Sequence, residues 1–441
     1  MFLDKALDEI GRKNKIVIGL DLTNDYVQIS YCRLDQSMPD TVSLVMGEEQ
    51  YNIPAVLCRK HQQEGQEEFW VIGKDALQTA KDGKGDLVED LLLLVRNNTS
   101  AQVGDKEYTP RELMEIFFKK LLGFTAAYTG GMELAAIAMT LKSIEPDTCN
   151  LLREAGSSAA GSQCEIFFMS HQDCFFQYIL HQPEEMWTQN VLLYDYRKDG
   201  IHSYELQMNR NSRPVVCLIG EENFPQMKMT DVSQMSDVQK QAFFTQLDNA
   251  FLEIVRNHCE GKFVSSAFLL GDHFTRDWCK DSLRYLCKGR RVFQGNNLFS
   301  KGACYGAREK VLPSTLSTTY VYLSDECLHA NIGMNCNRGK EETYQPLLNA
   351  GTNWYDARRS IDLILAKDNT LELTITPVDG GQAKIARITL EGLHVRGNKT
   401  NRIGLSICMK NAETAEIEIA DKGFGEFYPS SGRTWKESFV L

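Results

Sequence analysis

Two segments that lie far apart in the chain share one pattern of apolar and polar positions. In Ile16–Tyr31, an apolar run ends in Asp21, and a polar turn leads into a second run of alternating apolar residues. Val191–Leu206 repeats this order, with Asp195 after the first apolar run and a turn at Arg197–Gly200. Short apolar runs and period-two alternation predict strands. Each segment is therefore predicted to form a hairpin with a carboxylate at the end of its first strand.

The rest of residues 1–310 alternates between strand patterns and helical patterns. Further strands are predicted at Thr41–Met46, Tyr51–Leu57, Phe69–Ile72, Leu134–Leu141, Cys164–Met169 and Phe263–Leu270. Helices are predicted at Phe2–Ile10, from Gly73, from Pro110 to near Gly130, from Pro146 to Arg153, and at Cys174–Leu180, Val238–His258 and Trp278–Leu286. Asn211–Val238, rich in Met, Asn and Ser, is expected to be irregular. Strands that alternate with helices indicate an α/β fold, with mixed or parallel sheets covered by helices.

The pattern changes near residue 311, and residues 311–317 have the composition of a linker. Beyond this linker no amphipathic helix is predicted. Polar turns such as Asp379–Gly381 instead separate segments with the period-two alternation of strands. These segments are Ser360–Leu365, Thr370–Thr376, Ala383–Leu390, Asn401–Met409 and Glu416–Ile419. Residues 318–441 are therefore predicted to form an all-β sandwich domain.

Composition and charge narrow the class of protein. The net charge of −11 argues against binding to nucleic acid or to an anionic membrane, because no basic excess exists to displace counterions. No secretory signal is recognised, and no apolar run approaches the ~18 residues that span a bilayer, so a cytoplasmic protein is expected. The 13 cysteines are scattered singly, which favours free thiols. No metal site is expected, since Cys327, His329 and Cys336 lack a clear fourth ligand.

A series of short motifs follows a fixed order along the chain. The motifs are Ile18–Asp25, Ile53–Ala55, Val71–Asp75, Val191–Tyr204, Phe268–Arg276, Ala303–Ala307 and Ile388–Gly425. In this order they resemble the DnaK-type heat-shock chaperones, within the actin/hexokinase ATPase superfamily, and the resemblance covers nearly the whole chain. It implies an actin-like ATPase body at 1–310, with a reduced outer lobe, and a peptide-binding β-sandwich at 318–441. The chain resembles a divergent bacterial member of that family without a helical lid.

The resemblance implies a nucleotide site at Asp21, Thr23, Asn24, Asp195, Arg197, Lys198, Gly271 and Asp272. In the family, glycine-rich turns bring backbone N–H groups to about 2.9 Å from phosphate oxygens, an approach that a Cβ obstructs. Here Tyr196–Asp199 stands in place of the glycines of the second turn, and Leu22 replaces a glycine of the first. The side chains of Tyr196–Asp199 are expected to project into the phosphate space. No catalytic residue is assigned, and ATP and Mg²⁺ are cofactors only if the site is functional.

The resemblance also implies that the sandwich binds extended apolar peptides. The candidate residues are Ile332 and Met334 in one loop, and Ile364 and Leu365 beside another, where a segment would add by strand pairing. The leading hypothesis is a chaperone-like or scaffold protein that binds a protein or an extended peptide segment. Its ATPase site is expected to be degenerate and inactive.

Other interpretations of the same residues stay open. A working ATPase with an unusual pocket would use Arg197 and Lys198 in place of the missing backbone contacts. A sugar or small-molecule kinase of the superfamily would leave the terminal β-domain without a role. Asp21 and Asp195 would be simple turn caps if no ligand binds, since Asp often bonds the backbone of its own turn. The pair Arg197 and Lys198 is also more typical of a solvated turn than of an anion site.

Overall fold

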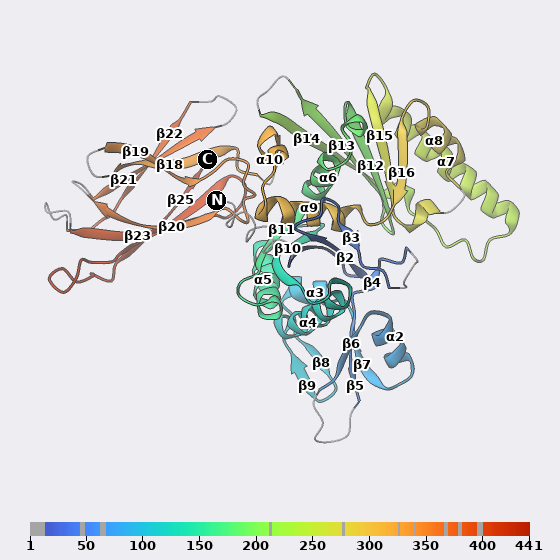
Figure 1. Ribbon diagram of the computed structural model, residues 1–441, viewed down its shortest axis with the longest axis horizontal. Coiled ribbons are helices and arrows are strands. Elements are labelled where there is room, and N and C mark those ends of the chain that lie inside the picture. Colours follow the sequence, from blue (N-terminus) through green and yellow to red (C-terminus); the bar gives the residue numbers. More distant parts are fainter. Residues whose placement is uncertain are drawn as a thin grey trace. The chain divides into compact units, whose positions relative to one another are not determined.

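The computed structural model describes residues 14–44, 49–61, 68–210, 214–275, 278–324, 327–338, 341–365, 369–377, 382–394 and 400–441. The chain divides into two compact units, Met1–Val321 and Tyr322–Leu441 (Figure 1). The predicted helix at Phe2–Ile10 and the predicted turn at Asp379–Gly381 lie outside the described residues.

The first unit contains two six-stranded sheets that repeat one strand order. The first sheet consists of β1 (Lys15–Leu22), β2 (Tyr26–Arg33), β3 (Asp40–Thr41), β4 (Ile53–Pro54), β10 (Glu133–Leu141) and β11 (Glu165–Ser170). The second consists of β12 (Asn190–Arg197), β13 (Gly200–Asn209), β14 (Val215–Phe224), β15 (Val264–Leu270), β16 (Arg291–Gly295) and β17 (Tyr320–Tyr322). In both sheets three consecutive strands pair antiparallel, and two later strands add in parallel beside the first of them. β1 and β12 are therefore equivalent strands.

The helices of the first unit repeat in the same way. In each copy one helix precedes each of the two parallel strands that are added to the sheet, and a third helix follows the second of these strands. They are α4 (Pro110–Thr129), α5 (Pro146–Ala160) and α6 (His171–Leu180) in the first copy, and α7 (Asp237–Cys259), α8 (Lys280–Leu286) and α9 (Leu298–Val311) in the second. The unit is thus a duplicated βββαβαβα arrangement, in agreement with the shared pattern of the two predicted hairpins.

The last helix of each copy contacts the sheet of the other copy. α9 packs on β1 so closely that a Cβ on Gly19 would stand 2.2 Å from the backbone nitrogen of Cys304. On α6, the ring of Tyr178 meets that of Phe268 in the second sheet, with centroids 5.8 Å apart. The two helices also cross each other at Gly302. The two copies are therefore joined through α6 and α9.

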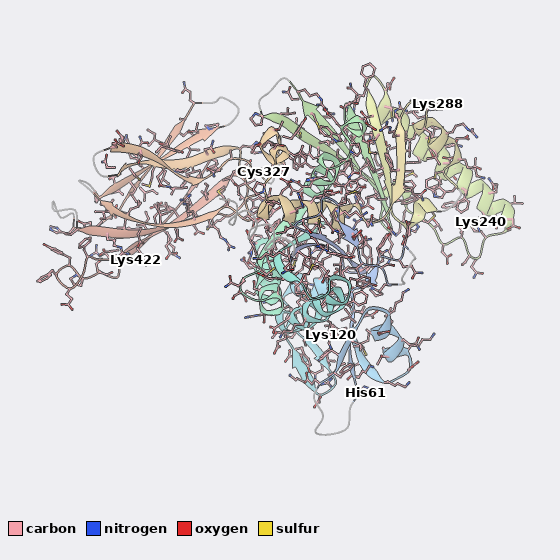
Figure 2. The ribbon with its side chains drawn as sticks, viewed as in Figure 1. His61, Lys120, Lys240, Lys288, Cys327 and Lys422 are labelled. Atoms are coloured by element: carbon pink, nitrogen blue, oxygen red, sulfur yellow. The ribbon has the colours of Figure 1, made fainter. Side chains whose placement is uncertain are left out.

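The first copy carries an insertion between β4 and α4. It contains β5 (Leu57–Lys60), β6 (Trp70–Ile72), α2 (Gly73–Lys81), β7 (Gly85–Val88), α3 (Leu91–Asn97), β8 (Ala101–Val103) and β9 (Lys106–Tyr108). In the second copy, residues 225–236 alone connect β14 to α7. Figure 2 shows the side chains of the described residues. Lys240, labelled there, is exposed near the start of α7.

Most predicted elements are confirmed, including both hairpins and the helices at α4 and α7. α4 begins where its sequence requires, because Thr109 and Glu112 cap its start reciprocally and Pro110 occupies the first turn. The irregular segment predicted at Asn211–Val238 is wrong over Val215–Phe224, where β14 pairs with β13 along its whole length, and is confirmed at residues 228–236, which contain no helix or strand. The strand predicted at Tyr51–Leu57 is also wrong. β4 pairs with β2, whereas β5 belongs to a separate small sheet.

The second unit contains two four-stranded antiparallel sheets. Its strands are β18 (Ala330–Arg338), β19 (Glu341–Leu348), β20 (Arg358–Leu365), β21 (Thr370–Pro377), β22 (Lys384–Thr389), β23 (Asn401–Met409), β24 (Thr414–Asp421) and β25 (Thr434–Val440). The orders are β19-β18-β21-β22 and β20-β23-β24-β25. Both sheets contribute to one hydrophobic core, which includes Leu373 and Ile417. The prediction of an α/β part followed by an antiparallel β domain is confirmed.

The segment predicted as a linker contains helical residues. α9 ends at Val311, and α10 (Thr315–Thr319) begins within residues 311–317. The hydroxyl of Ser314 accepts a hydrogen bond from the N–H of Leu316 at 3.2 Å, which supports the start of this short helix. Among the described helices, none combines the length and the apolar composition needed to cross a membrane.

Candidate functional site

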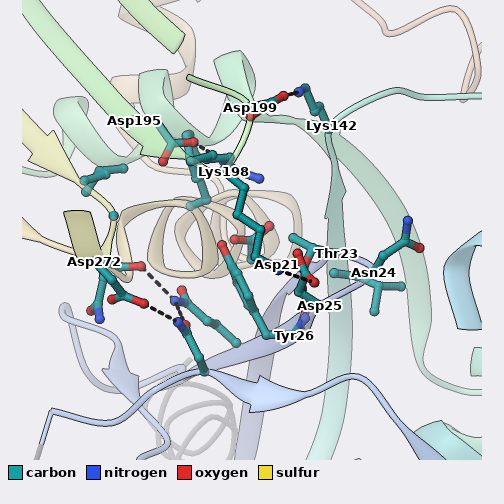
Figure 3. Close-up of a pocket in the computed structure, with 18 of the residues that line it drawn as sticks. Asp21, Thr23, Asn24, Asp25, Tyr26, Lys142, Asp195, Lys198, Asp199 and Asp272 are labelled. Carbon is teal, nitrogen blue, oxygen red and sulfur yellow. Dashed lines mark hydrogen bonds and ion pairs between the residues drawn. The ribbon is translucent and has the colours of Figure 1, made fainter. Parts of the chain in front are cut away.

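A pocket of about 470 Å³ is lined by residues of both copies of the first unit (Figure 3). The residues predicted for the nucleotide site all line it, namely Asp21, Thr23, Asn24, Asp195, Arg197, Lys198, Gly271 and Asp272. They meet because Asp21 and Asp195 end equivalent strands. The carboxylates of the lining are Asp21, Asp25, Asp195, Asp199 and Asp272, and its cations are Arg96, Lys142, Arg197 and Lys198. The volume lies within the range of small-molecule sites.

The turn after β1 is closed by its own hydrogen bonds. The N–H of Thr23 donates to the carbonyl oxygen of Tyr26 at 2.9 Å. The hydroxyl of Thr23 donates to the same oxygen at 2.8 Å and accepts from the N–H of Tyr26 at 3.0 Å. Leu22, which stands in place of a glycine of the resembled family, is buried. Thr23 therefore shapes the turn, and its hydroxyl proton is already used.

Asp21 contacts a histidine that the sequence patterns did not assign to the site. Nε2 of His171 lies 3.3 Å from the carboxylate of Asp21, and both side chains are buried. His171 is the first residue of α6, whose start is fixed by a reciprocal cap between Ser170 and Asp173. The His171 ring also stacks on Phe299 of α9, with centroids 4.1 Å apart. The residues of this cap, Ser170 and Asp173, directly follow a predicted strand and are a sequence signal from which the start of α6 at His171 can be found.

Arg197 turns back from the second turn toward the end of its own strand. Its Nε donates to the carboxylate of Asp195, and the two side chains are only 18% and 6% exposed. The guanidinium carbon lies 5.7 Å from the centroid of the Phe299 ring. Burial acts to lower the pKa of Arg197, but attraction to Asp195, Tyr26 and Asp21 outweighs it and raises the pKa above its ordinary value. The solvated turn predicted here is therefore wrong for Arg197, which is a nearly buried cation.

Ion pairs connect the tip of the second turn to its surroundings. Nζ of Lys198 lies 2.8 Å from the carboxylate of Asp25 in the first turn, and both groups are exposed (Figure 3). Asp199 lies 2.8 Å from Nζ of Lys142 and 3.1 Å from Nε2 of His202. Burial acts to raise the pKa of Asp199, but these two partners lower it to about 2. Exposed pairs add little stability, so these contacts mainly fix the positions of the two turns.

Packing between β12 and β15 explains why a tyrosine stands at position 196 and a glycine at position 271. Tyr196 is 1% exposed, and its ring packs in a hydrophobic core against Phe274 and Trp278. Gly271 has φ +96°, and a Cβ there would stand 2.3 Å from the carbonyl oxygen of Tyr196. A side chain at this position would therefore clash with β12 whether or not a ligand binds. The expectation that the Tyr196 ring crowds the phosphate space is wrong.

A set of amide contacts also bridges the two copies. Nε2 of Gln28 donates to the side-chain oxygen of Asn52 at 2.6 Å and to the carbonyl oxygen of Asn296 at 2.8 Å. Nδ2 of Asn52 lies 3.5 Å from the carboxylate of Asp272, at the outer limit of a hydrogen bond (Figure 3). Gln28 and Asn52 belong to the first copy, and the other two residues belong to the second. The side chain of Asp272 is therefore directed at the opposite copy.

The two strand-end carboxylates do not fit a magnesium–triphosphate group. Mg²⁺ requires carboxylate and water oxygens in octahedral geometry at about 2.0–2.1 Å. The Asp195 carboxylate already accepts from the Arg197 guanidinium, and Asp21 lies against His171. Each of these donors takes up part of the lone-pair capacity of its carboxylate, which has about four such sites. Asp195 is therefore already paired with a cation that would repel Mg²⁺, and Asp21 is already in contact with an imidazole.

Fold and site together define a class of protein: a duplicated α/β body with a polar pocket between its copies, followed by a unit of two antiparallel sheets. Residues 38–325 match the model described as "Family of unknown function (DUF5716) C-terminal", and residues 327–441 match a "Domain of unknown function (DUF8552)". The first match spans more than half of the chain, so this protein belongs to the DUF5716 family. No curated protein matches the chain.

The residues predicted to bind a peptide do not form one surface. Ile332 and Met334 lie within β18 rather than in a loop, and both belong to the hydrophobic core, as does Leu365. At Ile332 the backbone of β18 is paired with β19 on one side and with β21 on the other. A segment has no free edge to join at Ile332 and Gly333, and the loop predicted at Ile332–Met334 is part of a strand. Ile364 is 52% exposed on β20 and is the one predicted residue available at the surface.

Proposed function

We propose that this protein is a DnaK-type, chaperone-related binding or scaffold protein whose ATPase-type body does not hydrolyse ATP. The duplicated topology, with α6 and α9 joining the copies, supports an actin-like body. The buried pair between Asp195 and Arg197 carries the proposal, because it occupies the strand-end carboxylate with a guanidinium of the same chain. The charged turn at Lys198 and Asp199 offers side chains where phosphate would need bare backbone.

ATP hydrolysis is therefore expected to be absent. Purified protein should release phosphate from MgATP no faster than an Asp195→Asn variant, and millimolar MgATP should leave its melting temperature unchanged. A ligand that binds the native state alone raises the melting temperature by mass action, so differential scanning fluorimetry reports binding apart from turnover. An ATPase rate that Asp21→Asn or Asp195→Asn abolishes would contradict the proposal.

The proposed binding surface for a protein segment is the edge of β20. This strand is at one end of its sheet and pairs with β23 on its other side. An outer strand offers unpaired N–H and C=O groups to an added strand. Ile364 places an exposed apolar side chain on the same strand. The partner that fits is an extended, apolar segment of another protein.

Ile364→Glu is expected to weaken the binding of a fluorescent, extended apolar peptide by roughly tenfold. The variant loses the hydrophobic free energy that is gained when a bound peptide partly covers the Ile364 side chain. Fluorescence anisotropy measures this change. Ile385→Glu is the matched control, because Ile385 is 57% exposed on β22, the outer strand of the other sheet. The edge of β20 is the wrong surface if both variants bind the peptide equally well.

The alternative is an active ATP-binding chaperone with an atypical phosphate pocket. The cationic lining favours it, since Arg96, Lys142 and Lys198 could contact an anion directly. Nε of Arg96 is buried and has no hydrogen-bond partner among the described residues. This alternative requires a clear rise in melting temperature with MgATP, whereas the leading proposal requires none.

A further inference from the structure

We propose that the guanidinium of Arg197 takes the place of the divalent cation that strand-end carboxylates hold in a metal-dependent phosphate site. The wild-type pocket therefore binds no divalent cation, and an anionic ligand binds to it without an accompanying metal ion. This inference rests on the proposed function, because it explains how an ATPase-type body keeps its two aspartates without the metal chemistry.

The two aspartates create the need for a cation. Asp21 and Asp195 end equivalent strands, both line the pocket, and they are 2% and 4% exposed. Removing a carboxylate from water costs several kcal/mol unless a partner compensates the charge. Two such groups at one pocket therefore require positive charge close by, whether from a metal ion or from a side chain.

Arg197 supplies that charge from within the hairpin. In the described part of the chain, Asp195 has its ion pair with Arg197, and Asp21 has its contact with His171. Both of these partners lie against the same ring, because the Arg197 guanidinium is 5.7 Å from the Phe299 centroid and His171 stacks on it. The partner of Asp195 and the partner of Asp21 thus contact one ring, that of Phe299, which lines the pocket.

The chemistry of a guanidinium suits this position. It is always charged, and its N–H donors satisfy carboxylate lone pairs in a fixed geometry. It also needs less dehydration than Mg²⁺, which gives up its waters reluctantly. With the guanidinium in place, a second cation would be repelled by it. Without it, two buried carboxylates would line one pocket without that positive charge, and carboxylate oxygens are the ligands that divalent cations prefer.

The test is to remove the guanidinium and to add metal alone. Arg197→Ala is expected to bind Mn²⁺ at least roughly tenfold more tightly than the wild-type protein, because it loses a repelling charge close to the carboxylates. Isothermal titration and the electron paramagnetic resonance of Mn²⁺ measure the affinity, and millimolar MnCl₂ should raise the melting temperature of this variant only. Arg291→Ala is the matched control, since Arg291 pairs with Glu185 on the exposed surface of the same copy.

A second pair of variants keeps the test decisive if Arg197→Ala folds poorly. Arg197→Gln retains much of the side-chain volume and should also gain Mn²⁺ binding, and adding Asp195→Asn should remove that gain. Folded Arg197 variants with wild-type affinity for Mn²⁺ would overturn the inference. So would wild-type binding of Mn²⁺ that Asp21→Asn or Asp195→Asn abolishes.

The metal titration tests the role of Arg197 separately from the proposed function, because no nucleotide is present in it. Hydrolysis of ATP in the presence of a chelator would overturn the proposed function and leave the role of Arg197 intact. A magnesium-dependent ATPase would overturn both.

Discussion

Gly302→Ala is expected to lower the free energy of unfolding of the first unit by about 3 kcal/mol. A Cβ on Gly302 would stand 2.0 Å from the backbone carbonyl oxygen of Cys174, where α9 crosses α6. Backbone atoms cannot rotate away as a side chain can, so the two helices would have to separate. They connect the two copies; α9 carries Phe299, which lines the pocket, and α6 carries His171, which contacts Asp21. Urea unfolding followed by circular dichroism measures the change.

Gly123→Ala is the matched control for this prediction. Gly123 lies within α4, and a Cβ there would meet nothing within 4 Å. Alanine in a helix interior gains about 1 kcal/mol over glycine, so this variant should be slightly more stable than the wild type. Equal unfolding midpoints for Gly302→Ala and Gly123→Ala would show that α6 and α9 do not cross closely at Gly302.

His171→Ala is expected to lower the free energy of unfolding by about 3 kcal/mol. The substitution removes the partner of a carboxylate that is 2% exposed, and it removes a ring stacked on Phe299. Asp21 would then remain buried with its charge poorly compensated. Thermal and urea unfolding at neutral pH measure the loss.

The double variant His171→Ala/Asp21→Asn tests the cause of that loss. A neutral amide tolerates burial better than a carboxylate does, so the double variant should regain about 1–2 kcal/mol over His171→Ala alone. If stability falls further in the double variant, the contact with Asp21 is not what makes His171 stabilising. His171→Gln, which keeps a hydrogen-bond donor, should lie between the wild type and His171→Ala.

Local sequence patterns predicted much of the first unit because strands and helices leave their period in the chain. The apolar runs that end in Asp21 and Asp195 specified β1 and β12, and their similarity indicated the duplication that the sheets display. The candidate pocket residues were selected from the resemblance of the two turns and of Phe268–Arg276 to a known family, and all of them line one pocket. β14 was not predicted, because this segment lacks a clear alternation of apolar and polar residues. It forms a strand through its pairing with β13.

The sequence by itself thus determined the succession of elements, the two equivalent hairpins and the acidic groups at their strand ends. Only the tertiary structure decided where the side chains of those turns point. Arg197 bends back to Asp195, Tyr196 enters a core, and His171 reaches Asp21 from another helix. The physical reason is that burial is a property of the surroundings: a carboxylate that the fold covers must find a partner among whichever donors the fold brings to it.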